Sequence, residues 1–325
     1  MCGRYATTQT PASLNDAFGA DLADSFVELE PDYNMAPTKL APLVIARSPG
    51  GGAGAGAARM TESLWHAGFM CGRYATTQTS ASLNDAFGAD LADSFVELEP
   101  DYNMAPTKLA PLVIARSPGG GAGAGAANGG ADGPPTRELL TAKWGLVPSW
   151  AKDPSIGNRM INARSETVAD KPAFKKAFGK RRAIVPADGY YEWYKTEGDP
   201  EATSKKTPKQ PFYITPQDGS VLAMAGLYEF WRKDYDADDE EWLITYTILT
   251  TSAPDDLGHL HDRTPMMIEP DAVEAWLDPT PRPTDQLLGL LVPAVPGRLD
   301  AWPVSKAVNN VHNNGPELVV PLPAE

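Results

Sequence analysis

Cysteine and histidine are both scarce in this chain of 325 residues, which has two cysteines and four histidines. The cysteines, Cys2 and Cys71, occupy the same position in two copies of a repeated segment, so they cannot form a disulfide framework and we expect free thiols. No apolar run approaches the roughly 18 residues that a membrane-spanning helix needs, and no apolar signal-peptide core follows the first residues. The sequence therefore predicts a soluble, cytoplasmic protein without a membrane partner.

The few histidines also limit what metal sites the chain can form. His259 and His261 lie on one side of an extended segment, but a zinc site needs further Cys or His ligands, and only His66 and His312 remain besides the repeated cysteine. Histidine titrates near neutrality, so a role for one of this pair in proton transfer fits better, with a purely structural histidine as the alternative. We expect no metal and no cofactor.

Positive charge is outnumbered, with 28 Lys and Arg against 42 Asp and Glu, a net charge of −14. This balance argues against a nucleic-acid partner, because affinity for phosphates comes mostly from Lys and Arg. The charges are unevenly distributed: acid gathers in residues 234–241, whereas residues 171–182 form a basic block without an acidic residue. A local basic face on an acidic protein is therefore compatible with the sequence.

The chain contains a long internal repeat, because residues 1–58 recur as residues 70–127 with only Pro11 and Ser80 differing. Both copies begin with Met-Cys-Gly-Arg-Tyr. A cysteine in second position becomes the amino terminus once the methionine is removed, and it then carries an amine and a thiol on adjacent carbons. This pair traps aldehydes, since the amine forms an imine and the thiol closes on it as a thiazolidine. Either Cys2 or Cys71 can be terminal, but not both at once.

Short apolar segments of strand composition outnumber the helical ones along the chain. We expect an α+β fold, a single domain with a mainly antiparallel, barrel-like sheet and short flanking helices. The expected organisation is a duplicated N-terminal segment at 1–58, a linker at 59–69 and a complete domain at 70–325 with a Gly/Ala-rich loop at 117–135. Helices are predicted at 82–89, 172–178 and 270–277, and strands at 143–148, 182–186, 190–194, 212–215, 222–227 and 245–250.

Three groups of residues could carry chemistry. A strand at 190–194 puts Glu192 on the face opposite Tyr191 and Trp193, where a desolvated carboxylate suits a general acid or base; the alternative is a glutamate on the wet face of an edge strand. Asn162 and Arg164 share a face if extended and could hold a phosphate or a sugar oxygen, unless Arg164 forms an internal salt bridge with Glu166. Tryptophans 144, 150 and 193 are either core residues or stacking platforms for bases.

A set of ordered motifs resembles one known family. The motifs are Cys-Gly-Arg-Tyr, Asn103-Met104-Ala105-Pro106, Trp144 to Trp150, Ile161 to Thr167, Ala187 to Trp193, Pro211 to Ile214, His261-Asp262-Arg263 and Pro303-Val304-Ser305. In this order, over Met70 to the C-terminus, they are similar to the SRAP family, the SOS-response-associated peptidases. One departure is Thr264 after Arg263, where a bulkier residue than Thr is often seen.

The resemblance implies a protein that crosslinks itself to abasic sites in single-stranded DNA. By position, it implies a nucleophilic Cys2 or Cys71, an Asn162 that orients the sugar and the terminal residue, and Glu192 and His261 as proton carriers. It implies DNA contacts or a pocket lining from further residues: Arg4, Arg73, Asn103, Pro106, Trp144, Trp150, Arg164 and Thr250.

We therefore predict an abasic-site sensor, with lyase-like crosslinking chemistry, that forms a thiazolidine with the ring-opened sugar and protects the lesion in the DNA damage response. The expected partner is single-stranded DNA containing abasic sites, bound by a monomer that is nucleoid-associated when on DNA. Two alternatives stay open. One is a cysteine-dependent peptidase acting on itself or on short peptides through Cys, His261 and Glu192, and the other is a DNA-binding paralogue without catalysis.

Overall fold

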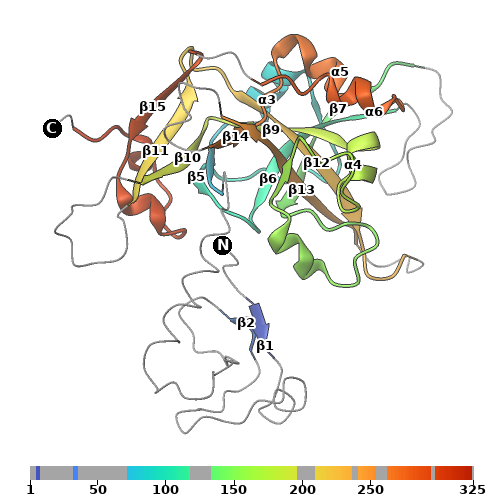
Figure 1. Cartoon of the computed structure of the whole chain (residues 1–325), viewed down its shortest axis with the longest axis horizontal. Helices are drawn as coiled ribbons and strands as arrows, with labels where there is room; N and C mark the ends of the chain where they lie inside the picture. The colour runs from blue at the N-terminus through green and yellow to red at the C-terminus, as the bar shows by residue number, and fades with distance from the viewer. Residues whose placement is uncertain are drawn as a thin grey trace, which may run out of the picture. The chain divides into compact units, whose positions relative to one another are not determined.

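The computed structural model describes residues 5–7, 32–35, 72–117, 133–195, 209–235, 241–253, 262–293 and 297–323 (Figure 1). Several predicted positions lie outside these residues: Cys2, Arg4, Cys71, His261 and the linker at 59–69. The chain divides into two compact units, Met1–Phe69 and Met70–Glu325.

The two copies of the repeat form the same β-pairing. In the first unit β1 (Tyr5–Thr7) pairs antiparallel with β2 (Asp32–Met35), with Tyr5 opposite Met35. In the second unit β3 (Tyr74–Thr76) pairs with β5 (Asp101–Met104), with Tyr74 opposite Met104. Both pairings have an irregularity between the first and third residue of the leading strand. The repeated sequence therefore fixes this register locally, whichever copy carries it.

A five-stranded sheet in the second unit contains the Cys-Gly-Arg-Tyr strand. Its order is β15-β11-β10-β3-β5, and every pairing is antiparallel. The strands not yet introduced are β10 (Gly189–Lys195), β11 (Lys209–Pro216) and β15 (Leu299–Pro303). β3 thus lies between β10 and β5. It begins at Tyr74, the last residue of the Cys-Gly-Arg-Tyr motif, so the motif leads into an inner strand of the sheet.

An eight-stranded sheet forms a ring, as the barrel-like prediction requires. Its order is β14-β13-β12-β9-β6-β7-β4, and an additional β13–β7 pairing closes the five strands from β13 to β7 on themselves. β8 also pairs with β13. The strands are β4 (Asp90–Leu91), β6 (Leu109–Arg116), β7 (Thr136–Trp144), β8 (Asn162–Arg164), β9 (Arg182–Ala187), β12 (Leu222–Trp231), β13 (Leu243–Ser252) and β14 (Arg263–Pro265).

Side-chain alternation along these strands separates the core into layers. On β6, Leu112 and Ile114 pack with Tyr74 and Trp144, whereas Val113 packs with residues of the helices. The helices α3 (Ser80–Phe87), α5 (Val273–Leu277) and α6 (Thr284–Leu288) lie along one edge of the second unit, with α4 (Lys175–Lys180) beside β12 (Figure 1). The 3-10 turns are η3 (Pro154–Arg159), η4 (Pro270–Ala272), η5 (Lys306–Asn309) and η6 (Pro316–Val319). Strands buried on both faces explain why the sequence reads as short apolar runs rather than as polar alternation.

Several predicted boundaries are wrong. The helix predicted at 82–89 begins earlier, because Thr79 caps it by accepting from Ser82 N at 3.2 Å, and it ends before Gly88, whose φ is 60°. The helix predicted at 172–178 is shifted to α4 and includes Gly179. The strand predicted at 143–148 ends at Trp144, because Gly145 turns with a φ of 122° and passes so close to Gly157 that a Cβ would lie 2.6 Å from its carbonyl oxygen.

Candidate functional site

Glu192 lies on β10, next to the start of the Cys-Gly-Arg-Tyr strand. β10 pairs with β3 through Tyr190 opposite Tyr74, and Tyr191 N donates to Arg73 O at 3.0 Å. Tyr190 belongs to the cluster of the ring interior and Tyr191 to the cluster on the other face, so alternation places Glu192 on the face of Tyr190. Glu192 is only 4% exposed. The predicted face is confirmed, and the alternative of a solvated edge position is wrong.

Asn162 and Arg164 lie on β8, which runs beside β13. Asn162 is opposite Ile248 and Arg164 is opposite Thr250, with Ala163 buried between the two. The two polar residues therefore share a face, as predicted. Asn162 is half-buried and Arg164 is exposed.

Glu166, the salt-bridge partner considered for Arg164, forms its salt bridge with Arg263 instead. Arg263 Nη1 donates to Glu166 Oε1 at 2.5 Å and its Nη2 donates to Oε2 at 2.9 Å. This hydrogen bonding lowers the pKa of Glu166 below its ordinary value, although burial opposes the shift. The charge of Arg164, whose side chain is exposed, lowers the pKa of Glu166 further.

Thr250 accepts hydrogen bonds from Arg263. The Nη2 atom of Arg263 also donates to Thr250 O at 2.6 Å and to its Oγ1 at 3.2 Å, and Thr250 has no exposed surface. In the sheet Thr250 lies between β8 and β14, and its expected place in the pocket lining stays a prediction. Sequence reasoning did not single out Arg263, although the His-Asp-Arg motif contains it.

Asn103 is also a buried structural residue. It is fully buried, its Oδ1 accepts from Arg73 Nη1 at 2.5 Å, and its Nδ2 donates to Val308 O, Asn310 O and Asn313 O at 3.3, 3.0 and 2.9 Å. The expected DNA contact from Asn103 is wrong, because its amide already binds the C-terminal segment 308–313. The structure thus joins the Asn-Met-Ala-Pro motif to the end of the chain.

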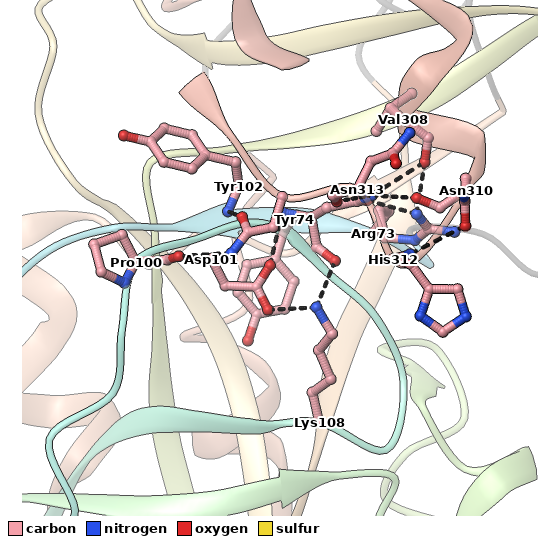
Figure 2. Close-up of polar contacts among 12 residues, drawn as sticks. Arg73, Tyr74, Pro100, Asp101, Tyr102, Lys108, Val308, Asn310, His312 and Asn313 are labelled. Carbon is pink, nitrogen blue, oxygen red and sulfur yellow. Dashed lines mark hydrogen bonds and ion pairs between the residues drawn. The ribbon is translucent and has the colours of Figure 1, made fainter. Parts of the chain in front are cut away.

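Arg73 points into the same network (Figure 2). Its Nη1 donates to Val308 O at 2.8 Å, and its guanidinium lies 5.8 Å from the ring centre of Trp193. Burial is the largest influence and lowers the pKa of Arg73, while Tyr191 and Asp101 oppose the shift. Arg73 is half-buried. Its hydrogen bond to Val308 O joins the C-terminal segment to the residue that precedes β3.

Trp144 is a core residue. It is fully buried, its ring centre lies 5.1 Å from that of Tyr74, and its Nε1 donates to Ile161 O at 2.8 Å. The predicted contact of Trp144 with DNA is wrong, because the closed ring of strands surrounds its side chain.

Trp150 and Pro106 are accessible. Trp150 is 58% exposed and follows Ser149, whose Oγ accepts from Lys176 Nζ at 3.1 Å. This contact brings the predicted basic block beside an exposed aromatic ring. Pro106 is half-buried and precedes Thr107, which has a φ of 76°, a left-handed conformation that is strained for a β-branched residue.

Within the described parts of the chain, no group of three or more His, Cys, Asp and Glu side chains is arranged to hold a metal ion. Among the same residues, no helix has the length and apolar character needed to cross a bilayer.

Comparison with known proteins identifies the chain's relatives. The family model described as SOS response associated peptidase (SRAP) matches residues 1–66 and 70–311. The abasic site processing protein YoqW of Bacillus subtilis is 34% identical over 250 residues, covering 77% of this chain and 99% of the relative. The abasic site processing protein HMCES of Gallus gallus is 32% identical over 285 residues, covering 78% of each chain.

A crystal structure of a protein from Bacteroides thetaiotaomicron has the same fold, with a TM-score of 0.60 at 24% identity, covering 78% of this chain and all of the other. The family match includes both copies of the repeat and nearly all of the second unit. The chain is therefore a member of the SRAP family.

Proposed function

We propose that this protein recognises abasic sites in single-stranded DNA and attaches to them covalently through an N-terminal cysteine. The relatives named abasic site processing proteins support the substrate. The observation that carries the proposal is the buried carboxylate of Glu192 on the strand that pairs with the Cys-Gly-Arg-Tyr strand.

The reaction needs an amine, a thiol and groups that move protons. The cysteine amine attacks C1′ of the ring-opened deoxyribose aldehyde, and loss of water gives an imine. The thiol sulfur then bonds to C1′ while its proton ends on the nitrogen, which closes a thiazolidine. Formation and loss of the carbinolamine each require a proton transfer, and a buried carboxylate is suited to that task.

Local geometry supports Glu192 in this role. Cys71 is bonded to Gly72, which precedes Arg73, and the Arg73 carbonyl accepts from the residue before Glu192 on β10. Asn162 lies on β8 and Arg263 on β14, two strands that both pair with β13, and His261 comes two residues before the start of β14 in the sequence. In this proposal Asn162 orients the sugar, and His261 assists proton transfer and reversal of the crosslink.

In this proposal DNA is held by exposed residues, among them Arg164 and Trp150. Arg164 is exposed and Trp150 offers an aromatic face next to Lys176, a combination that suits phosphates and unpaired bases. These contacts are local, so the net charge of −14 does not exclude them.

Either copy of the repeat could supply the terminal cysteine. The identical register of β1–β2 and β3–β5 supports an equivalent fit of both copies. Cys71 has a free amine only when translation begins at Met70 or the chain is cut before Cys71. We therefore propose that the form active in cells begins at Cys71. In an uncut chain the first copy of the repeat would take the position that the second copy otherwise occupies, and the chain would react through Cys2.

A second candidate is cysteine-dependent cleavage of the chain itself, which the family description as a peptidase favours. Cleavage of the bond between Met70 and Cys71 would expose the second aminothiol. Intact-mass measurement of the purified chain over time tests this, because cleavage yields the fragment that begins at Cys71 and an unchanged mass excludes it.

The main test is incubation of the full chain with single-stranded DNA that carries one abasic site. We expect an adduct that survives denaturation, and none with undamaged DNA. The double variant Cys2→Ala and Cys71→Ala should form none, and a full yield from it would refute the thiazolidine. Peptide mapping of the adduct then identifies the reacting cysteine by the residue at the crosslinked terminus.

A further inference from the structure

The exposed aromatic side chains of the second unit meet at one loop. Among the residues that the structure describes, Trp150 and Tyr235 are the only Phe, Trp or Tyr side chains that are exposed rather than partly or fully buried, at 58% and 40%. The Tyr235 hydroxyl donates to the carbonyl oxygen of Ser149, the residue before Trp150, at 3.0 Å. This bond joins segments that are 86 positions apart. Both exposed rings are thus attached to the same loop.

We propose that Tyr235, together with Trp150, stacks against unpaired bases of single-stranded DNA beside the lesion. The inference rests on the proposed function for its partner and adds to it a contact from Tyr235. An abasic nucleotide has no base of its own, so stacking energy has to come from the neighbouring nucleotides. Aromatic side chains accept any of the four bases, because every base has a π face. Such a surface holds the strand independently of its sequence.

The loop that carries Trp150 is held in place from two sides. Besides the bond from Tyr235 to Ser149, the carbonyl oxygen of Ala151 accepts from Trp231 Nε1 at 2.8 Å. The Tyr235 ring is itself supported, because Trp242 packs against it with ring centres 5.4 Å apart and ring planes at 75°. A contact surface that is ordered before its partner arrives loses less conformational freedom on binding. The two rings are therefore suited to stacking on a flexible strand.

Charges of both signs surround Tyr235. The exposed Lys176 donates to Ser149 Oγ at 3.1 Å, and the guanidinium of Arg232 lies 4.3 Å from the ring centre of Trp242. The sequence is acidic over residues 234–241, which follow Arg232 directly after Lys233. Because acid offsets the basic groups here, attraction for phosphates is weak at this position. The aromatic face of Tyr235 is the feature that distinguishes the surface, and it fits bases.

The test measures the affinity of the full chain for a labelled, undamaged oligothymidine by fluorescence anisotropy. Tyr235→Ala removes the ring, whereas Tyr235→Phe retains the ring and removes the bond to Ser149. Leu288→Ala is the matched control, because Leu288 is an apolar side chain on α6 that is exposed to the same extent, 39%. Each affinity is measured at low and at high salt, beside the urea midpoint of unfolding.

We expect Tyr235→Ala to weaken binding about tenfold, equivalent to about 1.4 kcal/mol. The factor should be the same at both salt concentrations, because the variant removes no charge that faces a phosphate. Tyr235→Phe and Leu288→Ala should bind as the unmodified chain does. An unchanged affinity for Tyr235→Ala would overturn the inference. Equal losses for Tyr235→Phe and Tyr235→Ala would also overturn it, since the hydroxyl and not the ring would then be the cause.

Tyr235→Leu gives a second measurement if Tyr235→Ala lowers the urea midpoint, because leucine keeps an apolar contact with Trp242 but has no π face. It should show the same loss of affinity. A chain that forms no adduct at abasic sites, yet binds oligothymidine through Tyr235, refutes the proposed function alone. A chain that forms the adduct but binds oligothymidine equally well without the Tyr235 ring refutes this inference alone, as does a chain that binds no undamaged strand.

Discussion

Replacing Asn103 by alanine should destabilise the second unit strongly, because this residue joins the first and last parts of that unit. Its side chain is fully buried and binds four groups: Arg73 Nη1 and the carbonyl oxygens of residues 308, 310 and 313. The Nδ2 atom has two hydrogens for three acceptors, so the network amounts to about three full hydrogen bonds.

The expected cost follows from these bonds. A buried hydrogen bond contributes roughly 0.5–1.5 kcal/mol, and a buried group left without a partner costs about 1–3 kcal/mol. Arg73 retains its bond to Val308 O, so the loss falls mainly on the carbonyl oxygens of the C-terminal segment. We expect a loss of about 2–5 kcal/mol in the free energy of unfolding.

Urea unfolding followed by tryptophan fluorescence measures this loss. With a denaturant slope of about 3 kcal/mol per molar urea, the midpoint should fall by about 1 M. Asn314→Ala is the matched control: Asn314 is exposed, its Oδ1 accepts from Tyr102 N at 2.8 Å, and its Nδ2 donates to Pro100 O at 3.0 Å.

The control should cost no more than about 1 kcal/mol, since water replaces the partners of exposed groups. Equal midpoints for Asn103→Ala and Asn314→Ala would refute the reasoning that the buried amide holds the C-terminal segment against β3. A DNA-contact role for Asn103 would instead reduce affinity while leaving the midpoint unchanged.

Three further predictions concern charge. Glu192→Gln should slow single-turnover crosslinking by about a hundred- to ten-thousandfold. The control is Glu229→Gln, which changes an equally buried carboxylate paired with Arg181 and should affect stability only. Equal slowing in both variants would show that Glu192 has a structural role. Arg164→Ala should lower the slope of log affinity for single-stranded DNA against log salt by about 0.7, and Arg298→Ala, whose partner is Glu269, should leave it unchanged; an unaltered slope for Arg164→Ala contradicts the phosphate contact. The lowered pKa of Glu166 means that its stabilising contribution is present above the ordinary value of 4.5 and is lost as the pH falls through the lowered value. Glu166→Gln should therefore reduce stability at pH 7, by less than about 1 kcal/mol because the carboxylate is 46% exposed, and should have no effect at strongly acid pH; a constant difference across pH would exclude the ion pair as its cause.

The sequence by itself determined the features that depend on neighbouring residues. Alternation along 190–194 set the face of Glu192, and the spacing of Asn162 and Arg164 set their common face, because the side-chain period of a strand is two. The repeat determined its own pairing register, which both copies reproduce. Residue identity also determined the aminothiol chemistry of a terminal cysteine.

Only the tertiary structure decided which polar and aromatic residues face inward. Asn103 and Trp144 stand in motifs expected to contact DNA, yet both are fully buried, because segment 308–313 binds the Asn103 amide and Trp144 packs against Tyr74 and Tyr246. Long-range contacts also selected Arg263, not Arg164, as the ion-pair partner of Glu166, and Tyr190 as the hydrogen-bond partner of Thr264. These partners are separated by 97 and 74 positions, a distance over which local periodicity carries no information, so burial and hydrogen bonding in the assembled sheets select them.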